Sequence, residues 1–193
     1  EELPQQIIEV GIAEQNLVGI SAGLSAGGKI VYGVSPSSFL TARSLEQIKN
    51  DIAYSNHPTK LIGISSGISY GQLGSTHHSL HDLAVLRAIN NITIVVPADN
   101  FETRESIKQA VNYKHPLFIR FGKKPMLKIH EEGDSFQIGK GVKIRDGNDI
   151  LFVTTGETAQ RALMASNLLD KKNISTSLIN MHTIKPFDND LFV

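Results

Sequence analysis

Short, largely apolar runs alternate with longer segments of helical periodicity through most of this sequence. The runs that predict strands are 29–34, 60–65, 93–96 and 117–121, and the segments that predict helices are 39–54, 80–89 and 100–113. Because the runs are mainly apolar, rather than alternately apolar and polar, both faces of the sheet should be covered. The order therefore predicts an α/β fold, with a mostly parallel sheet and helices on both faces.

The carboxyl ends of parallel strands meet at one edge of such a sheet, and α/β proteins bind their ligands there. Three segments follow predicted strands and should lie at that edge: 35–38, 66–79 and 122–125. Any binding or catalytic residues of the first 125 residues are therefore expected in or beside these segments.

The last third of the sequence predicts a second, smaller unit. Residues 126–136 are polar and interrupted by glycine, so we interpret them as an interdomain linker. The run GKGVKIRDGNDILFVTTG predicts two strands joined by a turn at Asp146-Gly147, and a helix over 158–169 and a strand over 175–179 follow. A lone βα unit cannot bury both faces of a sheet, so residues 137–193 are expected to form a truncated second α/β domain.

Composition excludes several classes of protein. The 193 residues include 19 basic and 19 acidic side chains, which argues against a nucleic-acid or membrane surface. No apolar run approaches the roughly 20 residues of a membrane span. Cysteine is absent, so disulfides and thiolate chemistry are excluded, and this composition is typical of a cytoplasmic protein.

The stretch EVGIAEQNLVGISAGLSAGG, residues 9–28, places a single carboxylate, Glu14, in the first turn of a small and apolar helix. A helix with almost no polar face should be buried on both sides. Glycines at 19 and 23 permit close approach of another backbone, so we expect residues 13–27 to associate with a second chain. A buried Glu14 must be paired, protonated or bonded to a ligand. The alternative is an ordinary glutamate favoured by the helix dipole.

The segment GSTHHSLHD carries three histidines and one aspartate: His77, His78, His81 and Asp82. If a helix begins there, His77 and His81 share one face, and this spacing is one that metal sites use. Solvated loop histidines are the alternative interpretation.

Two longer blocks carry a family resemblance. GIAEQNLVGISAGLS and YGQLGSTHHSLHDLAVLRAINNITIVVPAD, with FLTARSLEQIKNDIA between them, resemble the pyrimidine-binding domain of transketolase-like thiamine diphosphate enzymes. The resemblance covers nearly the whole chain. It implies that residues 1–125 have the thiamine diphosphate-binding fold without its first βα unit, and that residues 137–193 are the N-terminal part of a transketolase C-terminal domain. SYG and STHHSLHD are closest to the C-terminal section of split transketolases, in which a separate chain supplies the diphosphate site.

The resemblance assigns roles to particular residues. Glu14 matches the glutamate that shares a proton with a ring nitrogen of the cofactor's aminopyrimidine, and His77 matches a histidine that faces the reacting substrate. Phe39 matches an aromatic residue that packs against the aminopyrimidine. Leu45 stands where many transketolases have a further aromatic residue, so it would give an aliphatic contact with the cofactor.

Three further positions concern the substrate. Leu73 replaces an aspartate that lies near acceptor hydroxyls in many transketolases, and Ser65 replaces a histidine near the phosphate. Lys123 stands at the position of a phosphate-binding arginine and retains the positive charge. Arg120, on the predicted strand before it, could instead be a structural ion-pair residue.

The motif that holds magnesium and diphosphate in this superfamily is missing. Arg145-Asp146-Gly147 imitates its GDG element only loosely, because a turn rather than a phosphate-binding loop is predicted there. We therefore assign no metal ligand to this chain, and expect thiamine diphosphate to be bound with Mg or Ca held by a partner chain or domain. A homo-oligomer or a heterotetramer would provide such a partner.

The resemblance implies a transferase that moves a two-carbon ketol unit between ketose and aldose phosphates, inactive without its partner. A 1-deoxyxylulose-5-phosphate synthase-like enzyme and a 2-oxo acid dehydrogenase β-type subunit are the alternatives within the superfamily. A non-catalytic assembly subunit is the alternative from another class.

Overall fold

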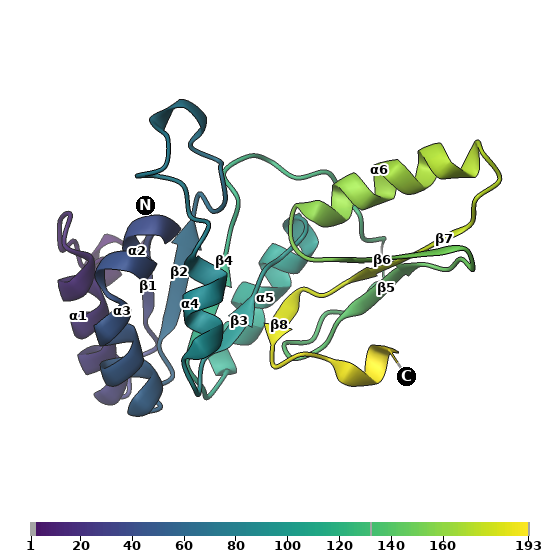
Figure 1. Cartoon of the computed structure of the whole chain (residues 1–193). Helices are drawn as coiled ribbons and strands as arrows, with labels where there is room; N and C mark the ends of the chain where they lie inside the picture. The colour runs from purple at the N-terminus through teal and green to yellow at the C-terminus, as the bar shows by residue number, and fades with distance from the viewer. Residues whose placement is uncertain (1–2, 132, 193) are drawn as a thin grey trace.

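A five-stranded sheet in the order β1-β2-β4-β3-β8 forms the centre of the computed structural model, which describes residues 3–131 and 133–192 (Figure 1). Its strands are β1 (Tyr32–Pro36), β2 (Lys60–Ile64), β3 (Thr93–Val95), β4 (Leu117–Arg120) and β8 (Thr183–Lys185). The pairs β1–β2, β2–β4 and β3–β4 are parallel, whereas β8 runs antiparallel to β3. The predicted mostly parallel sheet is confirmed.

Helices cover both faces of this sheet (Figure 1). One face carries α1 (Glu14–Ala26), α2 (Ser37–Arg43), α3 (Leu45–Gln47), a π-helical segment (Ile48–Tyr54) and α4 (Asp82–Ala88), and the other carries α5 (Asn100–Asn112). Alternation along the strands separates the two cores. Leu61 packs in the core of the first face, whereas Ile62 packs with residues of α5.

The predicted helix over 39–54 is broken into three pieces, α2, α3 and the π-helical segment. At the first break the Ser44 hydroxyl donates to the carbonyl of Leu40, a local bond that competes with regular helix geometry. As a result α2 is a short helix that begins directly after β1, at Ser37, and ends at Arg43.

The position of α2 depends on a glycine in β2. A Cβ atom at Gly63 would lie 2.8 Å from the Ser37 hydroxyl and 2.6 Å from the Phe118 ring. A larger side chain would therefore push α2 away from the sheet, together with Phe39 and Arg43, which it carries.

Helix α1 is buried on one side only within this chain. Val18, Ala22 and Ser25 face the core, but Gly23 and Ala26 are exposed, and Ile12 just before the helix is 92% exposed. The expectation that both sides are buried is therefore wrong for the chain by itself. The second side remains open to a further chain.

The last third forms a three-stranded sheet in the order β5-β7-β6, with α6 packed against it (Figure 1). The elements are β5 (Val142–Arg145), β6 (Ile150–Thr154), α6 (Thr158–Asp170) and β7 (Thr176–Asn180). The predicted strands and helix are present, but the hairpin is wrong, because β7 lies between β5 and β6. A Cβ atom at Gly147 would lie 2.2 Å from the Thr176 backbone, so the turn passes closely over the start of β7.

The chain then returns to the first sheet, a course that no pattern in the sequence predicts. The amide of Val96 donates to the carbonyl of His182 at 2.7 Å, and β8 follows directly beside β3. Residues 137–193 therefore contribute a strand to the first sheet as well as forming their own.

The segment 126–136 does more than connect the two sheets. His130 is 1% exposed, and Phe136 packs in the core beneath α5. The side chain of Gln109 on α5 donates to the carbonyl of Phe136 at 2.6 Å and accepts from the amide of Ile138 at 3.0 Å. These residues connect the two sheets, and two of them, His130 and Phe136, are also anchored in the core.

Across residues 3–131 and 133–192, none of the helices has the length and apolar character needed to cross a membrane.

Candidate functional site

Glu14 forms an ion pair in the first turn of α1. Its side chain is 5% exposed, and its Oε2 atom accepts a hydrogen bond from Nη1 of Arg43 at 2.8 Å. The Arg43 side chain, at the end of α2, is 50% exposed. Of the three predicted states of a buried Glu14, paired, protonated or bonded to a ligand, the structure shows the first, and the partner within the chain is Arg43.

A row of rings continues from this ion pair. The guanidinium of Arg43 lies over the Phe39 ring at 4.6 Å from its centroid. The His77 ring meets Phe39 edge-on at 5.1 Å and Tyr70 at 5.2 Å. The ammonium of Lys123 lies 4.2 Å from the Tyr70 centroid. The Arg43 ion pair and these ring contacts therefore join four of the predicted site residues: Glu14, Phe39, His77 and Lys123.

This row lies at the carboxyl edge of the sheet, as expected. Helix α2 follows β1, the segment 66–79 follows β2 and projects beyond the sheet in Figure 1, and Lys123 follows β4. Side chains that follow three neighbouring strands of the sheet, β1, β2 and β4, thus meet where ligands of parallel sheets bind.

A buried carboxylate fixes these three segments to one another. Asp82, 1% exposed, accepts hydrogen bonds from the Ser37 hydroxyl at 2.7 Å and from Nε of Arg120 at 2.8 Å. Arg120 also donates to the carbonyl of Ser79 at 3.3 Å. Burial by itself would raise the pKa of Asp82, but the hydrogen bonds and charge of Arg120 outweigh it and lower that pKa. Arg120 is a structural ion-pair residue, as the alternative interpretation proposed.

The loop that carries His77 begins with an unusual backbone. Ser65, directly after β2, has φ of 56° and is buried. Its left-handed conformation turns the chain out of the strand, and the backbones of Gly67 and Ser79 then pair across the neck of the loop. Leu73, in a 3₁₀ helix over Gly71–Leu73, is 56% exposed near the loop tip. Neither Ser65 nor Leu73 takes part in the row of rings.

The histidines of the loop face different partners. His77 Nδ1 lies 3.0 Å from the Thr76 hydroxyl, whereas His81 Nε2 lies 3.2 Å from the Thr41 hydroxyl. His78 Nε2 lies 3.1 Å from the Gly71 carbonyl. In the described part of the chain, no group of three or more histidine, aspartate or glutamate side chains is arranged to hold a metal ion.

Leu45 is not brought to this row. It packs against the core of the first face and lines a separate pocket with residues of the π-helical segment and the end of α4. An aliphatic contact between Leu45 and the cofactor stays a prediction, without geometric support. Two residues that were not predicted, Arg43 and Tyr70, lie between the predicted residues in space. Each is carried by the same short segment as a predicted residue, and that proximity in sequence is the one signal that could have found them.

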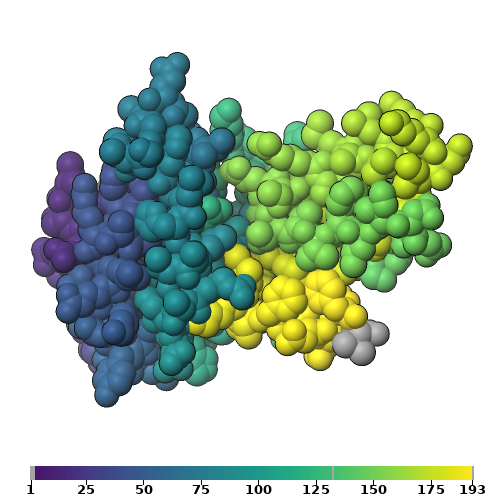
Figure 2. Space-filling model, viewed as in Figure 1, coloured from purple at the N-terminus to yellow at the C-terminus, as the bar shows by residue number. Residues whose placement is uncertain are grey.

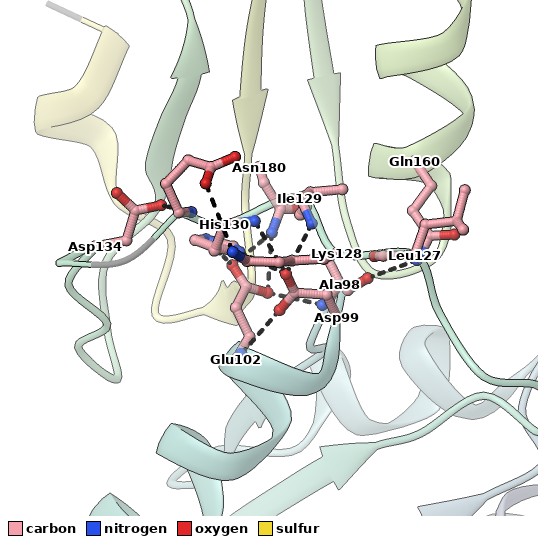
Figure 3. Close-up of polar contacts among 11 residues, drawn as sticks. Ala98, Asp99, Glu102, Leu127, Lys128, Ile129, His130, Asp134, Gln160 and Asn180 are labelled. Atoms are coloured by element: carbon pink, nitrogen blue, oxygen red, sulfur yellow. Dashed lines mark hydrogen bonds and ion pairs between the residues drawn. The ribbon is translucent and has the colours of Figure 1, made fainter.

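A second polar cluster is fully buried at the junction of the two sheets (Figure 3). Asp99 accepts from the amide of Glu102 at 3.0 Å, which caps α5, and its other oxygen lies 3.0 Å from Nδ1 of His130. His130 Nε2 lies 3.2 Å from Glu102, and Asn180 at the end of β7 donates to both Glu102 oxygens at 2.8 and 3.1 Å. The cluster therefore links α5, the segment 126–136 and the second sheet.

The charges of this cluster support one another. Burial opposes the charged form of His130, but its hydrogen bond to Asp99 and its ion pair with Glu102 raise the pKa of His130 to about 9. Burial likewise opposes ionisation of Asp99, yet bonds from His130 and the Glu102 backbone hold the pKa of Asp99 far below its usual range. Because every member is buried, we interpret the cluster as structural.

A cleft of about 770 Å³ separates the carboxyl edge of the first sheet from the start of α6. Its walls include Arg120 and Lys124 on one side and Glu157 and Arg161 on the other. The space-filling view in Figure 2 shows the hollow between the two bodies on this face.

Two known families match the two parts of the chain. The family described as the transketolase pyrimidine-binding domain matches residues 1–127, and the transketolase C-terminal domain matches residues 139–193. The chain belongs to the transketolase family. Thiamine diphosphate dependence is a property of this family, and its members are transferases.

Individual relatives agree with this assignment. The chain is 45% identical over 189 residues to an apulose-4-phosphate transketolase subunit of Phocaeicola vulgatus, and the match covers 97% of this chain and 61% of that protein. It is 35% identical over 196 residues to 1-deoxy-D-xylulose-5-phosphate synthase of Crocosphaera subtropica, covering all of this chain and 30% of that protein. A structure described as an inactive β4 tetramer of a split-gene transketolase superposes with a TM-score of 0.88 at 32% identity, covering 97% of this chain and 61% of that one. The chain thus spans about 61% of the length of the apulose-4-phosphate transketolase subunit.

Proposed function

We propose that this chain is the pyrimidine-binding part of a thiamine diphosphate-dependent transketolase that transfers a two-carbon ketol unit between ketose and aldose phosphates. The observation that carries the proposal is the buried Glu14 in the first turn of α1. The Phe39 ring lies close by, and the Arg43 guanidinium contacts both. A buried carboxylate beside an aromatic face is the environment that a proton-sharing aminopyrimidine requires.

The residues present fit the pyrimidine half of the cofactor. Glu14 would hold a proton at a ring nitrogen, and Phe39 would pack against the ring. When bound, thiamine diphosphate supplies the carbon nucleophile that carries the two-carbon unit. No diphosphate-binding GDG element occurs in the sequence, so a partner chain or domain would hold the diphosphate and its Mg or Ca.

The remaining row residues would serve the sugar. The His77 ring makes an edge contact with Phe39, and it would donate a hydrogen bond to an oxygen that gains charge beside the pyrimidine. Lys123, beyond Tyr70, would attract a phosphate as a point charge. Ser65, where the loop begins, and Leu73, near its tip, would shape the acceptor side.

A partner is required by this proposal, and relatives named as transketolase subunits support it. The assembly would be a homo-oligomer or a heterotetramer, with the open side of α1 at an interface. Mixing the chain with its partner chain, thiamine diphosphate and Mg²⁺ should restore ketol transfer between sugar phosphates. Tight, Mg²⁺-dependent cofactor binding by the chain alone would contradict the division of the site. Binding by neither the chain nor the mixture would favour a non-catalytic assembly subunit.

A 1-deoxyxylulose-5-phosphate synthase-like activity is the second candidate, and the 35% identity to such an enzyme favours it. The two reactions differ in their donor. Release of carbon dioxide from pyruvate by the assembled enzyme would support this candidate, whereas two-carbon transfer from a ketose phosphate without gas release would support transketolase.

Replacing His77 with alanine should lower kcat/KM for every acceptor aldehyde, by about 100-fold or more, because a donor to the developing charge is lost. The matched control is His115→Ala, an exposed histidine before β4 at the opposite edge of the sheet. Steady-state kinetics with several acceptors measures the effect. An equal, small effect of both substitutions would contradict the role of His77.

Replacing Leu73 with aspartate should change the ranking of acceptors by kcat/KM, because a polar partner for hydroxyls discriminates strongly between sugars. The Leu73→Asn variant separates the effect of charge from that of polarity. Kinetics with aldoses of opposite hydroxyl configuration provide the measurement. An unchanged ranking in both variants would show that the loop tip does not line the acceptor path.

A further inference from the structure

The guanidinium of Arg43 occupies the space between Glu14 and Phe39. It donates from Nη1 to the Glu14 carboxylate at 2.8 Å, and it lies over the face of the Phe39 ring at 4.6 Å. These are two independent contacts, one polar and one with a ring face, made by a single planar group.

An aminopyrimidine has the same two requirements. It is planar, it carries nitrogen atoms that hydrogen-bond to a carboxylate, and it packs by its face against an aromatic ring. Arg43 therefore satisfies Glu14 and Phe39 in the way the cofactor ring would, from within the chain.

We propose that Arg43 is a built-in competitor of the cofactor's aminopyrimidine, which must displace the guanidinium from Glu14 before the site is complete. This inference rests on the function proposed above, in which Glu14 and Phe39 bind the pyrimidine. It assigns to Arg43 the control of cofactor occupancy.

The structure favours an exchange of partners over an opening of the site. Glu14 is 5% exposed, so its carboxylate needs a partner at every stage. Arg43 is 50% exposed and is the last residue of α2, so water can solvate its guanidinium at little cost in free energy. Both residues line a hollow of about 620 Å³, together with Ile12 and Gln15, which leaves room for the arginine to move.

Competition between Arg43 and the aminopyrimidine lowers the apparent affinity of the site for the cofactor. The site binds cofactor only in the fraction of molecules in which Arg43 has moved away, and the measured dissociation constant rises accordingly. Removing the competitor should therefore tighten cofactor binding, an unusual result for the loss of a charged residue from a site for an anionic ligand.

The first test is a titration of the assembled, cofactor-free enzyme with thiamine diphosphate and Mg²⁺ by calorimetry. Arg43→Met should bind at least about fivefold more tightly than the parent, within the ordinary range of coupling between sites. Arg43→Lys should lie between them, because an ammonium pairs with the carboxylate but cannot imitate a planar ring. Arg104→Met, which removes an exposed arginine from α5 on the other face of the sheet, should leave binding unchanged.

Glu14→Gln distinguishes this proposal from the function on which it rests. If Glu14→Gln weakens binding but Arg43→Met binds equally or less tightly than the parent, competition by Arg43 is wrong and the proposed function stands. If Glu14→Gln has no effect on affinity, the pyrimidine role of Glu14 fails, and the competition fails with it.

The second test needs no cofactor. The free energies of unfolding of the parent, Glu14→Gln, Arg43→Met and the double variant form a double-mutant cycle. A favourable coupling between the two side chains is expected from their direct contact. The absence of coupling would overturn the proposal even if one variant altered folding.

Discussion

Replacing Glu14 with glutamine is expected to lower the turnover of the assembled enzyme by at least about a hundredfold, the usual contribution of a positioned proton-transfer group. Glutamine keeps the shape of the side chain and a hydrogen-bonding oxygen, but it cannot exchange a proton with a ring nitrogen. Folding should change little, because Arg43 is 50% exposed and water can replace its partner.

The measurement is kcat at saturating thiamine diphosphate, so that weakened binding does not count as lost chemistry. Glu105→Gln is the matched control, since Glu105 pairs with Lys108 on α5, on the opposite face of the sheet. Activity within a few-fold of the parent would show that Glu14 is not the proton-sharing residue.

Stability should depend on pH through the buried cluster of Asp99, Glu102 and His130. The pKa of His130 is raised from 6.5 to about 9, so its contribution to the free energy of unfolding is complete below 6.5 and is lost as pH rises through about 9. The pKa of Asp99 is lowered from 3.8, so its contribution is present above 3.8 and is lost as pH falls. The neighbouring His182, whose pKa burial lowers, also loses its contribution as pH falls below 6.5. Stability should therefore be greatest near pH 6.5 and decline on both sides.

Urea unfolding of the chain between pH 4 and 10 provides the test. His130→Gln should remove the alkaline decline and keep the acid one, because Asp99 and His182 remain. Asp99→Ala should cost about 3–5 kcal/mol at pH 6.5, since it leaves a buried cation without one partner and removes the cap of α5. The exposed His115→Gln should leave the profile intact. A parent whose stability is flat from pH 6.5 to 10 would contradict a charged His130.

The sequence predicts best those elements whose type and ends are determined by their own residues. The predicted strand over 60–65 and helix over 100–113 match β2 and α5 within one residue at each end. Continuous apolar character marks the strand, and Asp99 marks the start of the helix by capping it. In these segments local preference and tertiary packing agree.

The missed elements depend on distant partners. β8 has three residues, and its pairing with β3 rather than its composition makes it a strand. The predicted hairpin between β5 and β6 is wrong for the same reason, because β7, more than twenty residues later, takes the place between them. No property of the Asp146-Gly147 turn indicates that insertion.

The site shows the same division. The family pattern predicts Glu14, Phe39, His77 and Lys123, and the structure joins them by contacts. Arg43 is missed because its partner lies 29 residues away in sequence, and a single arginine in a helix has no pattern. The burial of His130 is missed because it depends on two acidic residues that are distant in sequence and equally buried.

The return of β8 to the first sheet affects how this protein can be divided. The boundary between the two family regions falls between residues 127 and 139, yet the strand on one flank of β3 comes from beyond residue 182. In a polypeptide that ends at that boundary, β3 would become an exposed edge strand with unpaired amides and carbonyls, which favours aggregation. The two regions are thus interlocked, and recombination or gene fission at this boundary would have to carry β8 along with the first region.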